Sequence, residues 1–353
     1  MHTDPLSLEE LASKVGGDAG GALGVLLAYI GDQSGVYRAL EDKGPVDCEA
    51  LAIETGLDAR YLREFLSANA AHGYVTYHQD MESFSLSPAQ AAIFAHEGEP
   101  TCMQGFFQTI VSQYATHEVA LHTFKTGEGR PWGEHDACCF CGTDRFFRPG
   151  YEANLIETWI PSLDGVDEKL TRGATVADIG CGHGSSTIMM AKRYPNSTFH
   201  GYDFHGPSIE EATQKAQVSG LNNVEFQESS AKEIPDKGYD FACIFDALHD
   251  MGDPLGAAKR IREVLAKDGT FMLVEPMAED SLQDNLEKNP MSGAYYSFST
   301  LVCVPTSKSQ EVGLQLGSQA GESRLTEVLN EAGFSQVRRT SENASNMVLE
   351  VKY

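Results

Sequence analysis

A glycine-rich turn between two expected strands carries the clearest chemical signal in this sequence. The turn contains three glycines, Gly180, Gly182 and Gly184. Such a turn lets a ligand contact bare backbone, and Asp178 lies just ahead of it. A second expected strand, 198–202, delivers Asp203 about twenty residues later, where a carboxylate can accept hydrogen bonds from both hydroxyls of a ribose. The spacing predicts a nucleoside-binding site.

The kind of nucleoside follows from the charge and the spacing of this turn. Dinucleotide sites use G-x-G-x-x-G and leave a helix N-terminus free for a pyrophosphate. Here the pattern is D-x-G-x-G-x-G, one residue tighter, and the carboxylate of Asp178 would repel a phosphate but attract an ammonium group. The segment resembles motif I of class I S-adenosylmethionine methyltransferases, whose cofactor carries an amino-acid tail and a sulfonium.

This resemblance implies a set of cofactor contacts. Asp178 and the backbone of the glycine turn, which includes Cys181, would hold the methionine tail. Asp203 would bind the ribose, and Phe204 would lie against the adenine. The third strand of the family normally presents an acidic residue followed by a small one to the adenine edge. In this sequence these places hold Ser230 and Ala231, and a hydroxyl accepts a hydrogen bond more weakly than a carboxylate.

A His-Asp pair, His249 and Asp250, follows the expected fourth strand of the second half of the chain. This strand, 239–245, runs into Asp246 and then His249, which we place near the cofactor amine and the acceptor respectively. The pair resembles plant-type small-molecule O-methyltransferases, in which the histidine removes the hydroxyl proton. An imidazole suits this role at neutral pH. The alternative is that His249 only caps a turn or touches the cofactor.

Glu275 ends the fifth strand and points toward the acceptor, where it would orient or polarise the substrate.

From residue 170 onward strands alternate with helices, which predicts a doubly wound α/β sheet with ligands at the carboxyl ends of its strands. The expected strands are 175–179, 198–202, 224–227, 239–245, 270–275, 336–340 and 346–352. The resemblance implies a seven-stranded class I methyltransferase sheet whose last strand is antiparallel. Residues 278–320 are too long for a plain connection and form a candidate lid.

The first part of the chain reads as helix, turn, helix and hairpin, which is a winged helix. We expect a winged-helix domain over 1–95, with helices that include 6–15 and 22–40. A helical connector should follow over 96–165, and the methyltransferase domain over 166–353. In the bacterial methyltransferases that this chain resembles, the first domain serves dimerisation and helps to wall the acceptor pocket. DNA binding is the alternative reading, but the second helix of the motif offers few cations.

Composition narrows the list of partners. Lys and Arg total 26 against 51 Asp and Glu, a net charge of −25 that repels nucleic-acid phosphates and anionic lipid. No apolar run reaches the ~20 residues of a membrane span, and the start of the chain does not resemble a signal peptide. We therefore expect a cytoplasmic protein without nucleic-acid or membrane partners.

Cysteines raise the question of a metal. The eight cysteines are mostly scattered, which suits a reducing compartment. Cys138, Cys139 and Cys141 lie close to His135, but structural zinc sites use paired C-x-x-C spacings on separate elements, so we predict no metal there.

The sequence therefore predicts a homodimeric methyltransferase that uses S-adenosylmethionine, releases S-adenosylhomocysteine and methylates a small molecule, with His249 as base for a hydroxyl acceptor. S- or N-methylation of a small molecule is the enzymatic alternative. A regulator that responds to S-adenosylmethionine, binds DNA through the winged helix and has lost turnover is the alternative from another class.

Overall fold

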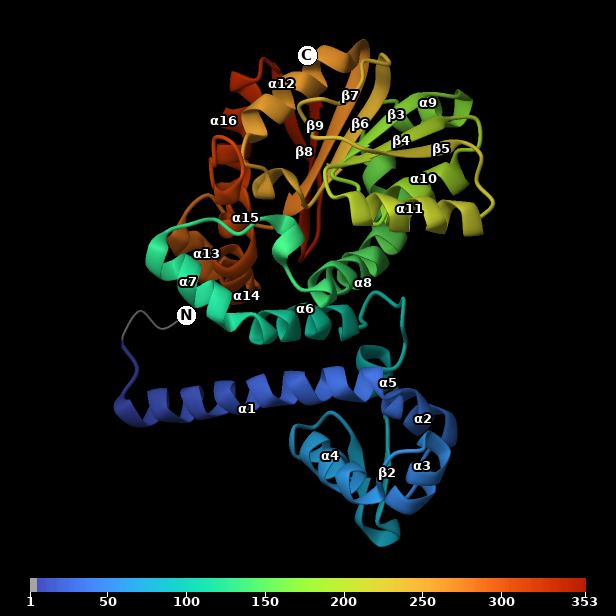
Figure 1. Ribbon diagram of the computed structural model, residues 1–353, viewed down its shortest axis with the longest axis vertical. Helices are drawn as coiled ribbons and strands as arrows, with labels where there is room; N and C mark the ends of the chain where they lie inside the picture. The colour runs from blue at the N-terminus through green and yellow to red at the C-terminus, as the bar shows by residue number, and fades with distance from the viewer. Residues whose placement is uncertain (1–4) are drawn as a thin grey trace. The chain divides into compact units, whose positions relative to one another are not determined.

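The computed structural model describes residues 5–353 (Figure 1). The chain forms two compact units. The first contains the residues up to 116 together with 136–150, and the second contains 117–135 together with 151–353. All residues that the sequence predicted for the catalytic and cofactor sites belong to the second unit.

The first unit begins with one long helix, α1 (Leu8–Gln33), where the sequence predicted a break between two helices. A capping box between Ser7 and Glu10 starts this helix. Its glycines each cost only about 1 kcal/mol, which a long helix tolerates. One of them is required by packing, because a Cβ at Gly31 would lie 2.4 Å from the ring of Tyr37.

The rest of the first unit confirms the winged-helix pattern. Asp58 caps the second helix of the motif, as its position in the sequence indicated. The hairpin strands are antiparallel, with Thr76 opposite Ser85. These elements are α2 (Val36–Lys43), α3 (Cys48–Thr55), α4 (Ala59–Ala71), β1 (Thr76–His78), β2 (Ser83–Ser85), α5 (Pro88–Phe94), α6 (Gln104–Ala115) and α8 (Ala137–Asn154), the last of which continues past residue 150 into the second unit.

The second unit is built on a seven-stranded sheet, as predicted, and the order of its strands is β5-β4-β3-β6-β7-β9-β8. The strands from β5 to β7 run parallel, and β9 is antiparallel to both of its neighbours. They span β3 (Thr175–Ile179), β4 (Thr198–Asp203), β5 (Val224–Glu228), β6 (Tyr239–Phe245), β7 (Leu265–Pro276), β8 (Gln336–Glu342) and β9 (Asn346–Lys352).

Strands β4, β5 and β8 extend one or two residues beyond the predicted limits, and β7 differs most from the sequence-based expectation. We predicted the start of β7 at Thr270, but it begins at Leu265, which pairs with Tyr239. The register then shifts before Thr270 pairs with Phe241, so the polar residues between the two pairs form an irregularity inside the strand.

Helices cover the sheet and form the connections between its strands. They are α7 (His117–Thr126), α9 (Val166–Arg172), α10 (Ser185–Arg193), α11 (Gly206–Val218), α12 (Pro254–Val264), α13 (Leu282–Lys288), α14 (Ser292–Phe298), α15 (Val304–Ser309) and α16 (Gly321–Glu331). The three from α13 to α15 lie in the segment that the sequence marked as a candidate lid. Within residues 5–353, none of the helices has both the length and the apolar character needed to cross a membrane.

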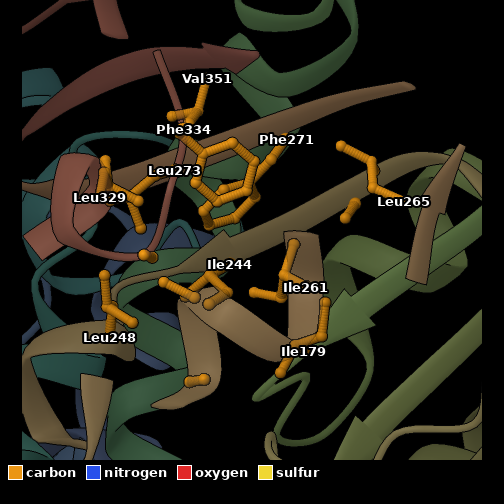
Figure 2. Close-up of a cluster of buried hydrophobic side chains, with 14 of the residues drawn as sticks. Ile179, Ile244, Leu248, Ile261, Leu265, Phe271, Leu273, Leu329, Phe334 and Val351 are labelled. Atoms are coloured by element: carbon orange, nitrogen blue, oxygen red, sulfur yellow. The ribbon is translucent and has the colours of Figure 1, made fainter. Parts of the chain in front are cut away.

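The core of the second unit lies between the sheet and two of its helices (Figure 2). Ile261 from α12 and Leu329 from α16 pack with Ile244, Phe271 and Leu273 from the central strands. Each fully buried side chain of this size stabilises the fold by roughly 1.5–3 kcal/mol. This packing fixes β6 and β7, whose carboxyl ends carry Asp246 and Glu275.

Candidate functional site

The glycine turn forms where the two central strands β3 and β6 lie side by side. Its glycines have left-handed backbone, with φ of 73° at Gly180, 51° at Gly182 and 75° at Gly184. A Cβ at Gly180 would lie 2.9 Å from the Cβ of Ala247, so the turn packs directly on the loop that follows β6. Helix α10 then begins at Ser185. Both conformation and packing therefore require glycine here.

Asp178 lies beneath this turn and is fully buried. Its Oδ2 atom accepts hydrogen bonds from the hydroxyls of Ser186 and Thr187, at 2.7 and 2.6 Å. Burial raises the pKa of Asp178 to about 6 despite these bonds. The carboxylate therefore anchors the first turn of α10, and its influence on a ligand is electrostatic.

Asp203 connects the end of β4 to the glycine turn. Its Oδ2 accepts from the backbone N–H of Gly182 and its Oδ1 from that of His205, both at 2.9 Å. Burial raises its pKa, and the two backbone hydrogen bonds oppose that shift. Phe204 follows with half of its surface exposed. A carboxylate oxygen can accept more than one hydrogen bond, so Asp203 retains the capacity to bind a ribose.

The predicted adenine contacts follow β5. The Ser230 hydroxyl donates to a carboxylate oxygen of Glu233 at 2.9 Å, so its proton is already engaged. Its oxygen can still accept a hydrogen bond. Ala231 is half-buried beside it.

Asp246 ends β6 in an uncommon backbone conformation, with φ of 49°. Its carboxyl accepts hydrogen bonds from the Tyr151 hydroxyl at 2.9 Å and from the Asn346 amide at 2.6 Å. Burial, with the charge of Glu275 as the next cause, raises the pKa of Asp246 to about 8. The carboxyl is therefore protonated at neutral pH until a positive charge approaches it.

His249 and Glu275 form a buried pair, with exposed fractions of 4% and 2%. Nδ1 of His249 lies 2.5 Å from Oε2 of Glu275, while Oε1 accepts from the backbone N–H of Leu248 at 2.9 Å. A carboxylate only accepts, so Nδ1 carries the hydrogen and Nε2 is the atom that can exchange a proton. Burial acts to lower the pKa of His249, but the charges of Glu275 and Asp250 outweigh it and hold the pKa well above its ordinary value.

Three residues at this site escaped the sequence analysis. Tyr151 and Asn346 hold Asp246 from positions far away in the chain. Cys303 lies beside His249 and Asp250, and burial raises the pKa of its thiol to about 12. The only available signal was the position of Asn346 as first residue of the last strand, where it pairs with Pro276 at the end of β7.

A strap formed by residues 129–135 links the candidate lid to the cofactor end of the site. The backbone N–H of Arg130 donates to the carbonyl of Pro305 at 2.9 Å, where α15 begins. A Cβ at Gly133 would lie 3.5 Å from the ring of His205, two residues after Asp203. The sequence indicated only a loop for most of this segment and a surface position for His205.

Two known protein families match the two parts of the chain. A methyltransferase domain family matches residues 170–333, and the Rv2258c-like winged helix-turn-helix domain matches residues 21–96. A demethylmenaquinone methyltransferase of Listeria monocytogenes is 28% identical over 182 residues, which is 49% of this chain and 75% of that protein. An uncharacterized methyltransferase, YcgJ, of Bacillus subtilis is 32% identical over 112 residues, 31% of this chain and 44% of that protein.

Solved structures share the fold over the whole chain. The mitomycin 7-O-methyltransferase MmcR matches with a TM-score of 0.74 at 19% identity, covering 97% of this chain and 98% of that one. Human N-acetylserotonin methyltransferase in complex with SAM matches with a TM-score of 0.73 at 16% identity, covering 100% and 99%. At these identities the likeness concerns the fold, including the order of the winged helix and the seven-stranded sheet.

Proposed function

We propose that this chain, whose residues 170–333 match a methyltransferase domain family, transfers a methyl group from S-adenosylmethionine to a hydroxyl of a small molecule. The observation that carries the proposal is the buried His249–Glu275 pair on the loop that packs against the glycine turn. The pair supports a base at His249, and the packing of its loop on the glycine turn supports a cofactor bound beside that base.

The residues of the second unit fit S-adenosylmethionine. The ammonium group of its amino-acid tail suits the acidic surroundings of the glycine turn, where Asp203 accepts a hydrogen bond from the backbone of Gly182 and Asp178 accepts one from Ser186. The bare backbone at Gly180, Cys181 and Gly182 can approach that tail closely. The ribose would bind Asp203, while Phe204, Ser230 and Ala231 would surround the adenine. The solved structure of a similar fold with SAM bound supports this choice of cofactor.

When bound, S-adenosylmethionine supplies an electrophilic methyl group on a sulfonium and leaves as S-adenosylhomocysteine. The chain then has two tasks, which are to align the acceptor and to remove its proton. Nε2 of His249 would take the hydroxyl proton, and Glu275 would fix the imidazole and stabilise the imidazolium that forms. Asp246 would face the cofactor amine, whose positive charge favours ionisation of that carboxyl.

The raised pKa of His249 sets a condition on this mechanism. In the site without ligands, the two neighbouring carboxylates favour the charged imidazole, which cannot accept a proton. A bound sulfonium adds a positive charge to the same end of the sheet and therefore favours the neutral imidazole. Cofactor binding would thus prepare the base before the acceptor arrives.

Methylation of an amine, or of a thiol, is the second candidate. The acceptor end of the site holds three carboxyl groups, from Asp246, Asp250 and Glu275, and such a set would attract a cationic amine. Amines and thiols also need less help from a base than hydroxyls do.

The regulator hypothesis is less favoured, because Arg60 and Arg63 on α4 pair with Glu64 and Glu49 instead of presenting free cations to DNA.

We further propose that the chain dimerises through its winged-helix domain, for which the predicted limits are residues 1–95. Five exposed apolar residues follow one stripe of α1 at helical spacing, namely Leu8, Leu11, Val15, Leu23 and Ile30. A second copy that pairs with this stripe would remove it from water. The limits of 96–165 for the connector and 166–353 for the catalytic domain, the lid role of 278–320 and a cytoplasmic location remain predictions of the same kind.

The proposal is tested by incubating the purified protein with a metabolite extract and S-adenosylmethionine that carries an isotopically labelled methyl group. Mass spectrometry should find a labelled small molecule, and fragmentation should place the label on oxygen. A label on nitrogen or sulfur would favour the second candidate. Absence of any labelled product, together with a salt-dependent shift of DNA, would overturn the enzymatic proposal.

A further inference from the structure

We propose that His249, Asp250 and Cys303 form a binding site for a thiophilic divalent cation, with Zn²⁺ as the ion that fits best. One ligand atom from each of these three residues lies within 4.8 Å of the other two. In the part of the chain that the structure describes, no other group of three His, Cys, Asp or Glu side chains converges in this way. These three residues are not the cysteines Cys138, Cys139 and Cys141, which the sequence analysis considered as metal ligands.

The spacing of the atoms matches a coordination sphere. Nε2 of His249 and Oδ1 of Asp250 lie 3.3 Å apart. Two nitrogen or oxygen ligands that each lie about 2.0–2.1 Å from a tetrahedral zinc are separated by roughly 3.3 Å. Oδ1 of Asp250 is buried, and the groups that face this carboxyl are Nε2 of His249 and the thiol of Cys303. The two atoms are placed to share a third partner.

The surroundings of the histidine support metal binding. A zinc-ligating histidine typically donates its other ring N–H to a carboxylate, which fixes the ring and raises its basicity as a ligand. Glu275 takes this hydrogen bond from Nδ1 of His249 and is itself held by the backbone of Leu248. The imidazole is therefore already oriented as a ligand through Nε2.

The burial of the three residues and the chemistry of their ligand atoms determine which ion the site would bind. His249 and Cys303 are buried, whereas the Asp250 side chain is 20% exposed. A thiolate, an imidazole and a carboxylate suit Zn²⁺ or Co²⁺, whereas Mg²⁺ and Ca²⁺ prefer an all-oxygen shell. Binding releases the thiol proton of Cys303 and the Nε2 proton of the charged imidazole to solvent, and the two anionic ligands balance the charge of the dication. Three protein ligands leave a fourth position open, as in catalytic zinc sites.

Cation binding and proton acceptance exclude each other at Nε2 of His249. A bound ion should therefore inhibit methyl transfer to any acceptor that needs this base, and that consequence rests on the proposed function. Binding of the ion itself does not depend on methyl transfer. The two ideas can thus fail separately.

The test is a titration of the full-length, metal-free protein with Co²⁺, read by absorption and by calorimetry. We expect one equivalent to bind and a thiolate-to-cobalt charge-transfer band to appear. The band should disappear in Cys303→Ser and persist in Cys141→Ser, a matched control because Cys141 is an exposed cysteine. Glu275→Gln should weaken binding about 10–100-fold while keeping the band, as expected for a residue behind the ligand.

Two results would overturn the proposal. One is the absence of a charge-transfer band in the folded wild-type protein. The other is a band of undiminished intensity in Cys303→Ser. Circular dichroism and S-adenosylmethionine binding of the Cys303→Ser variant verify that it is folded, and Asp250→Asn provides a second variant that should also weaken Co²⁺ binding. If Co²⁺ binds as expected but does not inhibit turnover, the site stands and the base assignment fails.

Discussion

Nδ1 of His249 and Oε2 of Glu275 lie 2.5 Å apart, although 26 residues separate them in the sequence. The contact joins the ends of β6 and β7, two strands that pair in parallel. It fixes which ring nitrogen carries the hydrogen, and it leaves Nε2 as the atom that can bind a proton or a cation. The predictions below test this assignment and the cofactor site beside it.

Substitution of His249 by alanine should lower turnover ~10²-fold or more, because the acceptor would lose its general base. S-adenosylmethionine should still bind with unchanged affinity, since the glycine turn and Asp203 are untouched. Steady-state kinetics and calorimetry measure the two effects. His122→Ala, at an exposed position on α7, is the control that should keep full activity. Full activity of His249→Ala would remove the argument for a base at this position.

Substitution of Glu275 by glutamine should lower kcat at least about tenfold and leave the Kd for S-adenosylmethionine unchanged. Glutamine keeps the size of the side chain but loses the charge that stabilises the imidazolium. A structural role alone would lower the melting temperature without this split between turnover and binding. The expectation is wrong if Glu275→Gln keeps wild-type kcat, or if kcat and cofactor affinity fall together.

Affinity for S-adenosylmethionine should decline as the pH falls from 7 toward 5. Burial raises the pKa of Asp178 to about 6, so this carboxyl gains a proton within this range, and burial also raises the pKa of Asp203. The ionised carboxylates attract the positively charged cofactor, so binding is strongest above the pKa and weakens below it. Calorimetry across this range measures the slope. Asp178→Asn should flatten it, and an equally steep decline in that variant would exclude Asp178 as its source.

Substitution of Asp203 by alanine should weaken S-adenosylmethionine binding by at least ~1.5 kcal/mol, the cost of losing hydrogen bonds to a charged acceptor. The side chain also holds the backbone of Gly182, so the loss should exceed that of the ribose contacts alone. Calorimetry measures the change. Asp268→Ala is the control, because that side chain is 81% exposed and lies at the start of β7. Unchanged affinity of Asp203→Ala would refute the ribose assignment.

Replacement of Leu11 and Val15 on α1 by glutamate should convert a dimer to monomers, because charged residues cannot be buried in an apolar interface without a large cost. These side chains are 47% and 55% exposed, so the fold of a single chain does not require them. Light scattering with size-exclusion chromatography measures the mass. Glu9→Gln is the control on another side of the helix. Removal of residues 1–95 should likewise yield monomer or aggregate, and a well-behaved active dimer would place the interface elsewhere.

The sequence by itself determined the sheet and the cofactor turn. Residues 175–179, 239–245 and 346–352 were predicted as strands and have those limits in the structure. These segments were readable because buried strands appear as short apolar runs, and the glycines because their left-handed backbone excludes other residues. Local patterns of this kind depend on near neighbours in the chain. By contrast, the unbroken course of α1 was missed, because a propensity as weak as that of glycine is outweighed by the rest of a long helix.

Only the tertiary structure decided how the side chains at the strand ends are paired. Asp246 is held by Tyr151 and Asn346, which lie 95 and 100 residues away, and Cys303 reaches His249 from the segment between β7 and α16. No periodicity or motif records such contacts. They arise when packed helices bring distant parts of the chain to one edge of the sheet, where burial then shifts the pKa of each group.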